Sequence, residues 1–200
     1  MSAGATGVAA VVLAAGASTR MGEPKALLRI GDGSSYVEAI AATARAGGCD
    51  EIVVVLGPPH GDTIRAQLAS APPSPSATIA WNPDPSRGML SSVHAGIAAL
   101  SAGVTAALVW PVDIPFVAVA TVRTLVMHSG TIVVPVHNSR GGHPLRLGRG
   151  WLAEVMTLDP ARGLKALLEA HAADVTRLPV DDAAVLVDVD TPEDYARTRA

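Results

Sequence analysis

The sequence contains one cysteine, few aromatic residues and no excess of basic charge. Cys49 is the only cysteine among the 200 residues, which excludes an internal disulfide and a cysteine-based metal cluster. Aromatic residues make up 3% of the chain, so the core must be built mainly from Ala, Val, Leu and Ile. Such a core is typical of β-branched strands covered by alanine-rich helices. The composition therefore predicts an α/β protein.

The charge balance and the short hydrophobic runs argue against two classes of partner. The formal net charge is −3 and no long basic run occurs, so we expect no nucleic acid partner. The apolar run at residues 8–17 is too short to cross a bilayer, and residues 1–7 lack the cationic start of a signal peptide. We expect no membrane partner and a cytoplasmic location, with Cys49 as a small buried hydrophobic residue.

Apolar runs of strand length alternate with amphipathic segments of helical length in the first two thirds of the chain. Strands are expected at residues 8–14, 51–56, 78–81, 106–112 and 131–136. Helices are expected at residues 34–46, 62–70, 91–101 and 117–128. The alternation implies right-handed βαβ units, and hence a Rossmann-like three-layer sandwich with a mostly parallel sheet. We expect one domain over residues 1–200, with residues 1–7 flexible.

The pattern after residue 136 is less regular. We expect strands at residues 143–147, 175–179 and 185–189, and helices at residues 150–158, 161–172 and 191–199. Thr191 and Pro192 give the last helix an N-cap and a proline in its first turn. The prolines and serines of residues 72–76 indicate a loop, because a strand pattern resumes directly after them.

Residues 11–25, VVLAAGASTRMGEPK, carry an apolar run into a loop of small residues with two cations, Arg20 and Lys25. Small residues let backbone N–H groups approach phosphate oxygens, and fixed cations neutralise the remaining charge. The loop lacks both the three-glycine dinucleotide pattern and the Walker pattern, which weighs against a hydride-transfer enzyme. We therefore expect a polyphosphate site, with a strand-to-helix turn bearing solvated cations as the alternative.

The same loop fits the pattern L-A-A-G-x-S-x-R-M-G-x-x-K at every specified position. It resembles the nucleotidyltransferases of the molybdenum-cofactor type, especially the molybdenum cofactor cytidylyltransferases. The resemblance implies the nucleotide-diphospho-sugar transferase type of fold, with one late antiparallel strand and the triphosphate over the carboxyl edge of the sheet. It also implies catalytic roles for Arg20 and Lys25 on the phosphates and nucleotide contacts from the residues around them, namely Leu13, Ala14, Ala15, Gly16 and Ser18. The guanylyl-transferring relatives usually carry Gly in place of Ala15, which favours CTP over GTP.

A second polar string follows the strand predicted at residues 78–81. Asn82 lies at the strand end, and Gly88, Ser91 and Ser92 belong to a G-M-x-S-S turn that opens a helix. These groups would place an amide, hydroxyls and backbone N–H donors beside a ligand. A helix N-cap explains Ser91 equally well. The cytidylyltransferases have a similar string, so the resemblance implies contacts with the base and ribose of the nucleotide.

Two aspartates are candidate ligands of Mg²⁺. Asp113 follows an apolar strand and therefore lies at the carboxyl edge of a parallel sheet, where ligands of open α/β folds bind. Mg²⁺ often bridges one or two carboxylates to phosphates, although a turn also explains Asp113. Asp188 and Asp190 share one face of an extended segment, and Asp190 either binds metal or caps the next helix. The resemblance makes Asp113 a catalytic metal ligand and Asp190 the second ligand, with Asp188 as the alternative.

The region between Ile114 and Ala153 contains no Asp or Glu but several arginines, which would attract a phosphorylated acceptor. The resemblance places a similar G-H-P string where the second substrate binds. The predicted acceptor residues are therefore Arg140, Gly142, His143, Pro144 and Arg146. A turn is the alternative explanation of His143. The other histidines, His60 among them, lack metal-ligand spacing and are expected at the surface or in packing.

Together these features predict a Mg²⁺-dependent nucleotidyltransferase that moves CMP from CTP to a phosphorylated acceptor and releases pyrophosphate. The resemblance implies molybdopterin as the acceptor, and a molybdoenzyme or its chaperone as a protein partner. An ionised acceptor phosphate needs no side-chain base, so positioning and charge neutralisation suffice. Three alternatives stay open: a sugar-phosphate nucleotidyltransferase, an oxidoreductase of the same fold acting on an aromatic or pterin-like ring, and a non-catalytic nucleotide-binding protein or chaperone.

Overall fold

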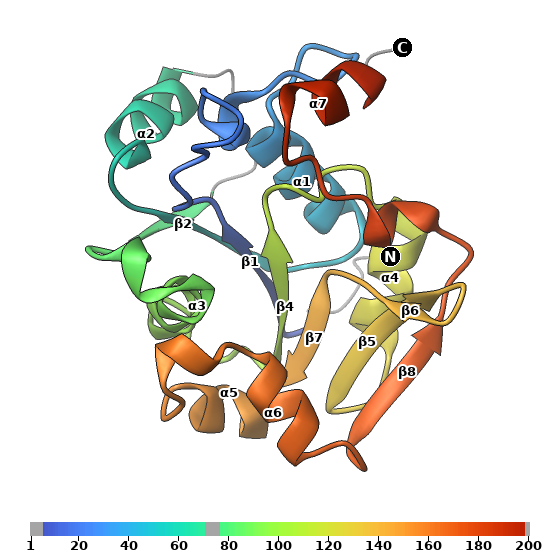
Figure 1. Ribbon diagram of the computed structural model, residues 1–200. Coiled ribbons are helices and arrows are strands. Elements are labelled where there is room, and N and C mark those ends of the chain that lie inside the picture. Colours follow the sequence, from blue (N-terminus) through green and yellow to red (C-terminus); the bar gives the residue numbers. More distant parts are fainter. Residues whose placement is uncertain (1–5, 71–76, 199–200) are drawn as a thin grey trace.

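The computed structural model describes residues 6–70 and 77–198, and in these residues an eight-stranded sheet carries helices on both faces (Figure 1). The expectations for residues 1–5 and for the proline-rich loop at 72–76 lie outside the described residues. Thr6 and Gly7 are described. The Thr6 hydroxyl donates to the carbonyl of Gly48 at 2.8 Å, and the Gly7 N–H donates to the Asp50 carboxylate at 2.6 Å.

Four parallel strands form the first half of the sheet. β1 (Val8–Leu13) lies between β2 (Glu51–Leu56) and β4 (Ala106–Pro111), and β3 (Thr78–Trp81) pairs with the outer side of β2. Every residue of β1 and β4 is buried. Helices cover both faces, which is why these strands are apolar throughout and do not alternate. The predicted α/β class and mostly parallel sheet are confirmed.

The second half of the sheet reverses direction. β7 (Leu145–Gly148) lies antiparallel between β4 and β5 (Ile132–His137), and β8 (Val175–Pro179) runs parallel to β5 on its other side. β7 is the predicted late antiparallel strand. The two-residue strand β6 (Arg140–Gly141) is a second antiparallel strand that the sequence did not predict.

Residues 142–144 interrupt what is otherwise one strand running from β6 into β7. The partners Val136–Gly141 and Val133–Arg146 differ in register by two residues, so the chain bulges away from β5 between them. The His143 N–H donates to the carbonyl of Val185 at 2.9 Å, and the Gly142 N–H to the carbonyl of Pro135 at 2.8 Å. A segment close to the carboxyl end of the chain therefore fills the break in the sheet.

Two hydrophobic cores separate the sheet from its helices. Val12 and its neighbours pack against α1 (Tyr36–Ala46) and α4 (Val119–Met127). Val11 and its neighbours pack against α3 (Met89–Ala98), α5 (Arg149–Val155) and α6 (Lys165–Ala170). The remaining helices are α2 (Gly61–Ser70), α7 (Pro192–Thr198) and four 3-10 turns, Lys25–Leu27, Pro85–Arg87, Pro160–Arg162 and Ala183–Leu186.

Two predictions for the last third of the chain are wrong. Residues 185–189 do not form a strand, because the Asp182 carboxylate accepts from the Ala184 N–H and starts a 3-10 turn there. The same carboxylate accepts from the Ala118 N–H and the Thr121 hydroxyl, which holds the segment against the start of α4. The helix predicted at 161–172 is split at Gly163, whose φ of +66° interrupts the helical backbone.

Cys49 is 2% exposed, and burial raises the pKa of its thiol to about 12. The expectation of a small buried hydrophobic residue is confirmed. Among residues 6–70 and 77–198, no helix has both the length and the apolar character needed to cross a bilayer.

Candidate active site

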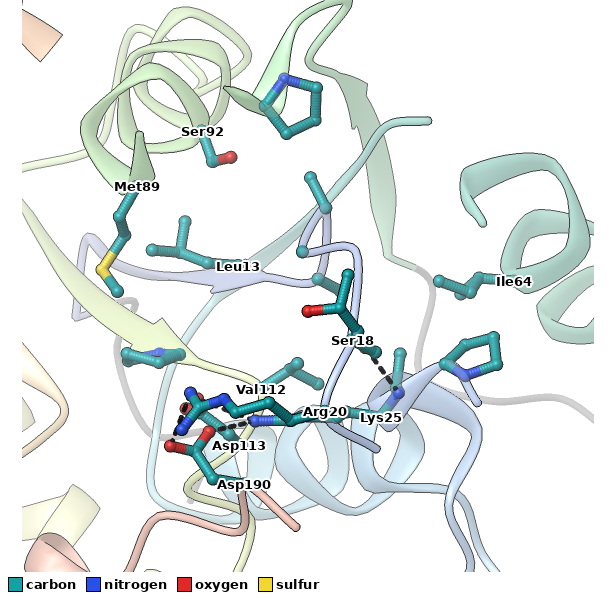
Figure 2. Close-up of a pocket in the computed structure, with 18 residues that line it drawn as sticks. Leu13, Ser18, Arg20, Lys25, Ile64, Met89, Ser92, Val112, Asp113 and Asp190 are labelled. Carbon is teal, nitrogen blue, oxygen red and sulfur yellow. Dashed lines mark hydrogen bonds and ion pairs between the residues drawn. The ribbon is translucent and has the colours of Figure 1, made fainter. Parts of the chain in front are cut away.

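A cavity of about 290 Å³ lies at the carboxyl edge of β1 and β4 (Figure 2). The opening loop forms one wall, α3 begins on another, and Asp113 and Asp190 lie at the base. Ten of the predicted site residues line it: Leu13, Ala14, Ala15, Gly16, Ser18, Arg20, Lys25, Ser92, Asp113 and Asp190. The structure therefore brings most of the predicted nucleotide and metal residues together.

The opening loop is held in shape by its own backbone and by Ser18. Ser18 has a positive φ of +51°, its carbonyl accepts from the N–H groups of Met21 and Gly22, and its hydroxyl accepts from the Lys25 N–H at 3.1 Å. This turn starts the 3-10 helix at Lys25 and directs its side chain across the cavity. At Gly16 an added Cβ would meet no described atom within 4 Å, so protein packing does not require a glycine there.

The two cations and two carboxylates form one network. The Lys25 ammonium donates to Asp190 and lies 3.6 Å from the Asp113 carboxylate, and Arg20 pairs with Asp190 at 2.8 Å. The Lys25 side chain is 11% exposed, whereas that of Arg20 is 68% exposed. Lys25 is therefore the buried charge of the site, and Arg20 covers it from solvent.

The two carboxylates differ in their pKa. Burial raises the pKa of Asp113, and the nearby Lys25 charge only partly offsets this effect. The hydrogen bond from Lys25 lowers the pKa of Asp190, and its charge and that of Arg20 lower it further. Asp190 is thus the more firmly ionised of the pair, and Asp113 would gain most from an added positive charge.

The donor set suits a cation that brings ligands of its own. Among the residues that the structure describes, no three His, Cys, Asp or Glu side chains gather closely enough to enclose a metal ion. Two carboxylates that share one ammonium group are a partial set, as expected for Mg²⁺, which usually keeps waters and binds phosphates. Asp113 and Asp190 therefore fit a divalent cation bound together with a polyphosphate.

Asn82, Gly88 and Ser91, which were predicted to contact the nucleotide, are not among the described residues that line the cavity. The side-chain amide of Asn82 is 3% exposed and donates to the hydroxyls of Ser91 and Ser92 at 2.8 and 2.9 Å. Gly88 precedes α3 with a φ of +101°, which favours glycine. Within the described chain these three residues lie behind the cavity lining, and they support Ser92 and Met89, which face it.

Arg146 does not reach the carboxyl edge of the sheet. Its guanidinium donates to the carbonyl of Gly130, which precedes β5 and so lies at the opposite edge. Arg149 likewise donates to the carbonyls of Ala102 and Val104, before β4. We therefore remove Arg146 from the predicted acceptor site, because its place in β7 directs it away from Asp113. Arg140 is exposed in β6, directly after the turn at residues 138–139.

His143 and Pro144 lie in the bulge between β6 and β7, beside the carboxyl edge. Burial lowers the pKa of His143, although the Asp113 charge and the Val109 backbone oppose this shift. The imidazole is therefore neutral near pH 7 and adds no positive charge for a phosphate. Gly142 has no room for a side chain, since an added Cβ would stand 2.2 Å from the carbonyl oxygen of Val185.

Sequence reasoning missed several apolar residues of the cavity and one histidine. Ile64, Pro85 and Met89 line it, and Met89 is 56% exposed although it is apolar. The signal for Met89 was present, because it lies inside the G-M-x-S-S turn. His60, expected at the surface or in packing, has its Nε2 3.1 Å from the carbonyl of Ala17 and so packs on the opening loop.

A model of the MobA-like NTP transferase domain matches residues 10–175. The chain belongs to the MobA-like NTP transferase family. Asp190 lies beyond the matched residues, and only the fold brings it to the loop. The family assignment supports nucleotidyltransferase activity.

Individual relatives differ in what they are named for. The chain is 37% identical over 201 residues to nicotine blue oxidoreductase of Paenarthrobacter nicotinovorans, covering 95% of both chains. It is 25% identical over 186 residues to the molybdenum cofactor cytidylyltransferase of Escherichia coli K12, covering 92% of both. The structure of Rv0371c from Mycobacterium tuberculosis H37Rv superposes with a TM-score of 0.82 at 30% identity, covering 96% of both chains. A structure of Rv0371c in complex with manganese gives a TM-score of 0.77 at 28% identity, covering 96% of this chain and 97% of that one.

Proposed function

We propose that the protein transfers CMP from CTP to a phosphorylated, molybdopterin-type acceptor and releases pyrophosphate. The observation that carries the proposal is the buried Lys25 ammonium between Asp113 and Asp190, directly below the small-residue loop (Figure 2). A cation and two carboxylates at one edge of a parallel sheet provide what a metal-bound triphosphate needs.

In this reaction an oxygen of the acceptor phosphate attacks the α-phosphorus of CTP. The new bond forms as the bond between the α-phosphorus and the bridging oxygen breaks, and the electron pair leaves with pyrophosphate. Lys25 and Arg20 neutralise the charge that develops on this leaving group, and the loop amides bind its oxygens. Gly16 leaves room for phosphate oxygens, since no atom of the described residues lies within 4 Å of the place where its Cβ would stand.

Asp113 and Asp190 would hold Mg²⁺, which would bind together with the triphosphate. The bound ion would supply further charge neutralisation during transfer. The manganese complex of Rv0371c supports the use of a divalent cation in similar proteins. Lys25 now pairs with both carboxylates, so binding of the metal with its nucleotide would redirect the ammonium towards the phosphates.

The choice of CTP rests on Ala15 and on the cytidylyltransferase relative. Ala15 is 1% exposed and lines the cavity, so its methyl group would lie close to a nucleotide bound there. The choice of a molybdopterin-type acceptor rests on the same cytidylyltransferase relative.

Pyrophosphate release tests the proposal. Purified protein is incubated with Mg²⁺ and CTP, GTP or ATP in parallel, with and without molybdopterin. We expect release with CTP that depends on molybdopterin and on Mg²⁺. Lys25→Met should lower the rate by about 100-fold or more, as loss of a preorganised charge-stabilising group does. Arg123→Met removes an exposed cation from α4 and should leave the rate unchanged.

Absence of release with every nucleotide, or an unchanged rate in Lys25→Met, would contradict the proposal. A specific observation favours one other candidate, because the 37% identical relative is named as an oxidoreductase. Oxidation of NADH or NADPH with a quinoid dye, unaffected by Asp113→Asn, would establish that candidate in place of nucleotidyl transfer, since hydride transfer needs neither carboxylate.

A further inference from the structure

A second cavity, of about 390 Å³, lies on the face of the sheet that carries α6. It is bounded by β5, β8, α6 and the bulge between β6 and β7, which can be followed in Figure 1. Four aliphatic side chains, Val134, Leu145, Leu168 and Val175, form one part of its wall, and polar groups of the bulge and of β8 form the rest. Cavities that combine apolar side chains with a few placed polar groups are typical of sites for small organic ligands.

Arg177 provides the charge of this cavity. It is paired with Val134 in the β5–β8 register, so both side chains lie on the α6 face. One guanidinium nitrogen lies 4.0 Å from the place where a Gly141 Cβ would stand, which shows that Arg177 extends across β5 towards β6. The cavity lining contains no carboxylate, and no ion pair of Arg177 is present within residues 6–70 and 77–198.

The bulge connects this cavity to the site in Figure 2. His143 lines the cavity, and its N–H donates to the carbonyl of Val185, in the same segment whose Val189 N–H donates to the carbonyl of Asp113. An acceptor held here would therefore lie beside the carboxyl edge at which Asp113 and Lys25 meet. Arg146, which the sequence favoured for the acceptor, donates at the opposite edge, so the acceptor needs a different cation.

The surroundings of Arg177 also indicate the chemistry of the ligand. A guanidinium presents two parallel N–H donors, which match two adjacent acceptor atoms on one planar edge. The aliphatic side chains of the wall favour the faces of a ring system, and the exposed Arg177 guanidinium lies at the edge of the cavity. A fused heterocycle with a carbonyl oxygen beside a ring nitrogen satisfies both conditions.

We propose that Arg177 and the aliphatic cavity around it bind the fused heterocyclic ring of the acceptor, an inference that rests on the proposed function. The phosphate end of the acceptor extends past His143 to the α-phosphorus of the nucleotide. Arg177 thus selects the acceptor and takes no part in binding the triphosphate.

Binding of 6-hydroxymethylpterin, followed by its fluorescence, tests the inference without any turnover. The titration uses wild type, Arg177→Gln, Arg177→Lys and Leu168→Trp, which narrows the cavity. Arg123→Gln, on the opposite face of the sheet, is the matched control. We expect Arg177→Gln to weaken pterin binding by about 10- to 100-fold, as loss of a charged hydrogen-bonding partner does. Arg177→Lys should also weaken it, because lysine lacks the paired donors.

Binding of Mg²⁺ with CTP is measured by calorimetry on the same variants and should stay unchanged. Loss of pyrophosphate release in wild type with intact, Arg177-dependent pterin binding would refute the proposed function and leave the cavity assignment standing. Equal pterin affinity in wild type, Arg177→Gln and Leu168→Trp would refute the cavity assignment. Arg177-dependent binding of 2-naphthoate as tight as that of the pterin would overturn the ring-edge assignment in favour of a simple anion.

Discussion

At the residue scale, the site depends on how unequally its charges are buried. Lys25 is nearly enclosed and contacts both Asp113 and Asp190, whereas Arg20 is mostly in solvent. A buried charge interacts more strongly than an exposed one, because solvent screens it less. Lys25 is therefore the cation on which transfer depends most, although the sequence presented the two cations as equals.

In the absence of metal and nucleotide, the ionised Asp113 carboxylate should lower the free energy of unfolding. Its pKa is higher in the folded protein than the ordinary value of 3.8, so the folded state loses stability as the pH rises through this range. In EDTA we expect Asp113→Asn to melt about 2–4 °C above wild type at pH 7, a shift that corresponds to about 1 kcal/mol. The difference should disappear near pH 4. Melting curves at the two pH values provide the measurement.

Asp190→Asn is the control variant, for which the expected change in melting temperature has the opposite sign. The pKa of Asp190 is lowered by Lys25, so its contribution to stability is present at pH 7 and is lost as the pH falls below 3.8. This variant should melt below wild type at pH 7. Equal melting temperatures for wild type and Asp113→Asn at pH 7 would contradict the burial argument.

At the element scale, the start of α3 is positioned by Asn82. Its amide joins the end of β3 to two serines of α3, and its carbonyl accepts from the Asp84 N–H at 3.1 Å. The sequence predicted that Asn82 contacts the nucleotide. In the structure its side chain is buried and both side-chain polar atoms bond within the protein, so it supports the start of α3.

Asn82→Ala should therefore destabilise the protein by about 1–3 kcal/mol, since it leaves buried hydroxyls without their partner. Urea denaturation followed by circular dichroism measures this. Asn138→Gly is the control, because Asn138 is exposed and has a φ of +48°, which glycine accepts readily. A stability loss no larger than that of the control would show that Asn82 does not have this structural role.

At the scale of the whole molecule, the site joins distant parts of the chain. The loop after β1 supplies Lys25, the end of β4 supplies Asp113, and the segment before α7 supplies Asp190 (Figure 1). Val189 donates its N–H to the carbonyl of Asp113 at 2.8 Å, which fixes the last of these segments against the sheet. The two carboxylates are thereby held near one ammonium group.

Mg²⁺ and CTP should stabilise this arrangement only together. Two carboxylates already neutralised by Lys25 offer little to Mg²⁺ alone, so we expect its melting shift to stay below about 1 °C. Mg²⁺ with CTP at 100 times the dissociation constant should add about 2.7 kcal/mol of stability. Differential scanning fluorimetry with each ligand alone and with both measures the shifts. A full shift with Mg²⁺ alone would indicate a metal site formed entirely by the protein.

The parallel half of the sheet and the content of the opening loop follow from local patterns in the amino-acid sequence. Buried strands require continuous apolar runs, and a phosphate loop requires small residues beside cations. Which distant side chains meet depends instead on how the strands are ordered and paired in the folded protein. Arg146 and Arg177 cannot be told apart by their local sequence. Strand order and register place Arg146 towards the edge of the sheet opposite Asp113 and Arg177 at the second cavity. Residues 185–189 follow the same principle, because the contact of Asp182 with α4 and that of Val189 with Asp113 hold this segment out of the strand that its own pattern predicts.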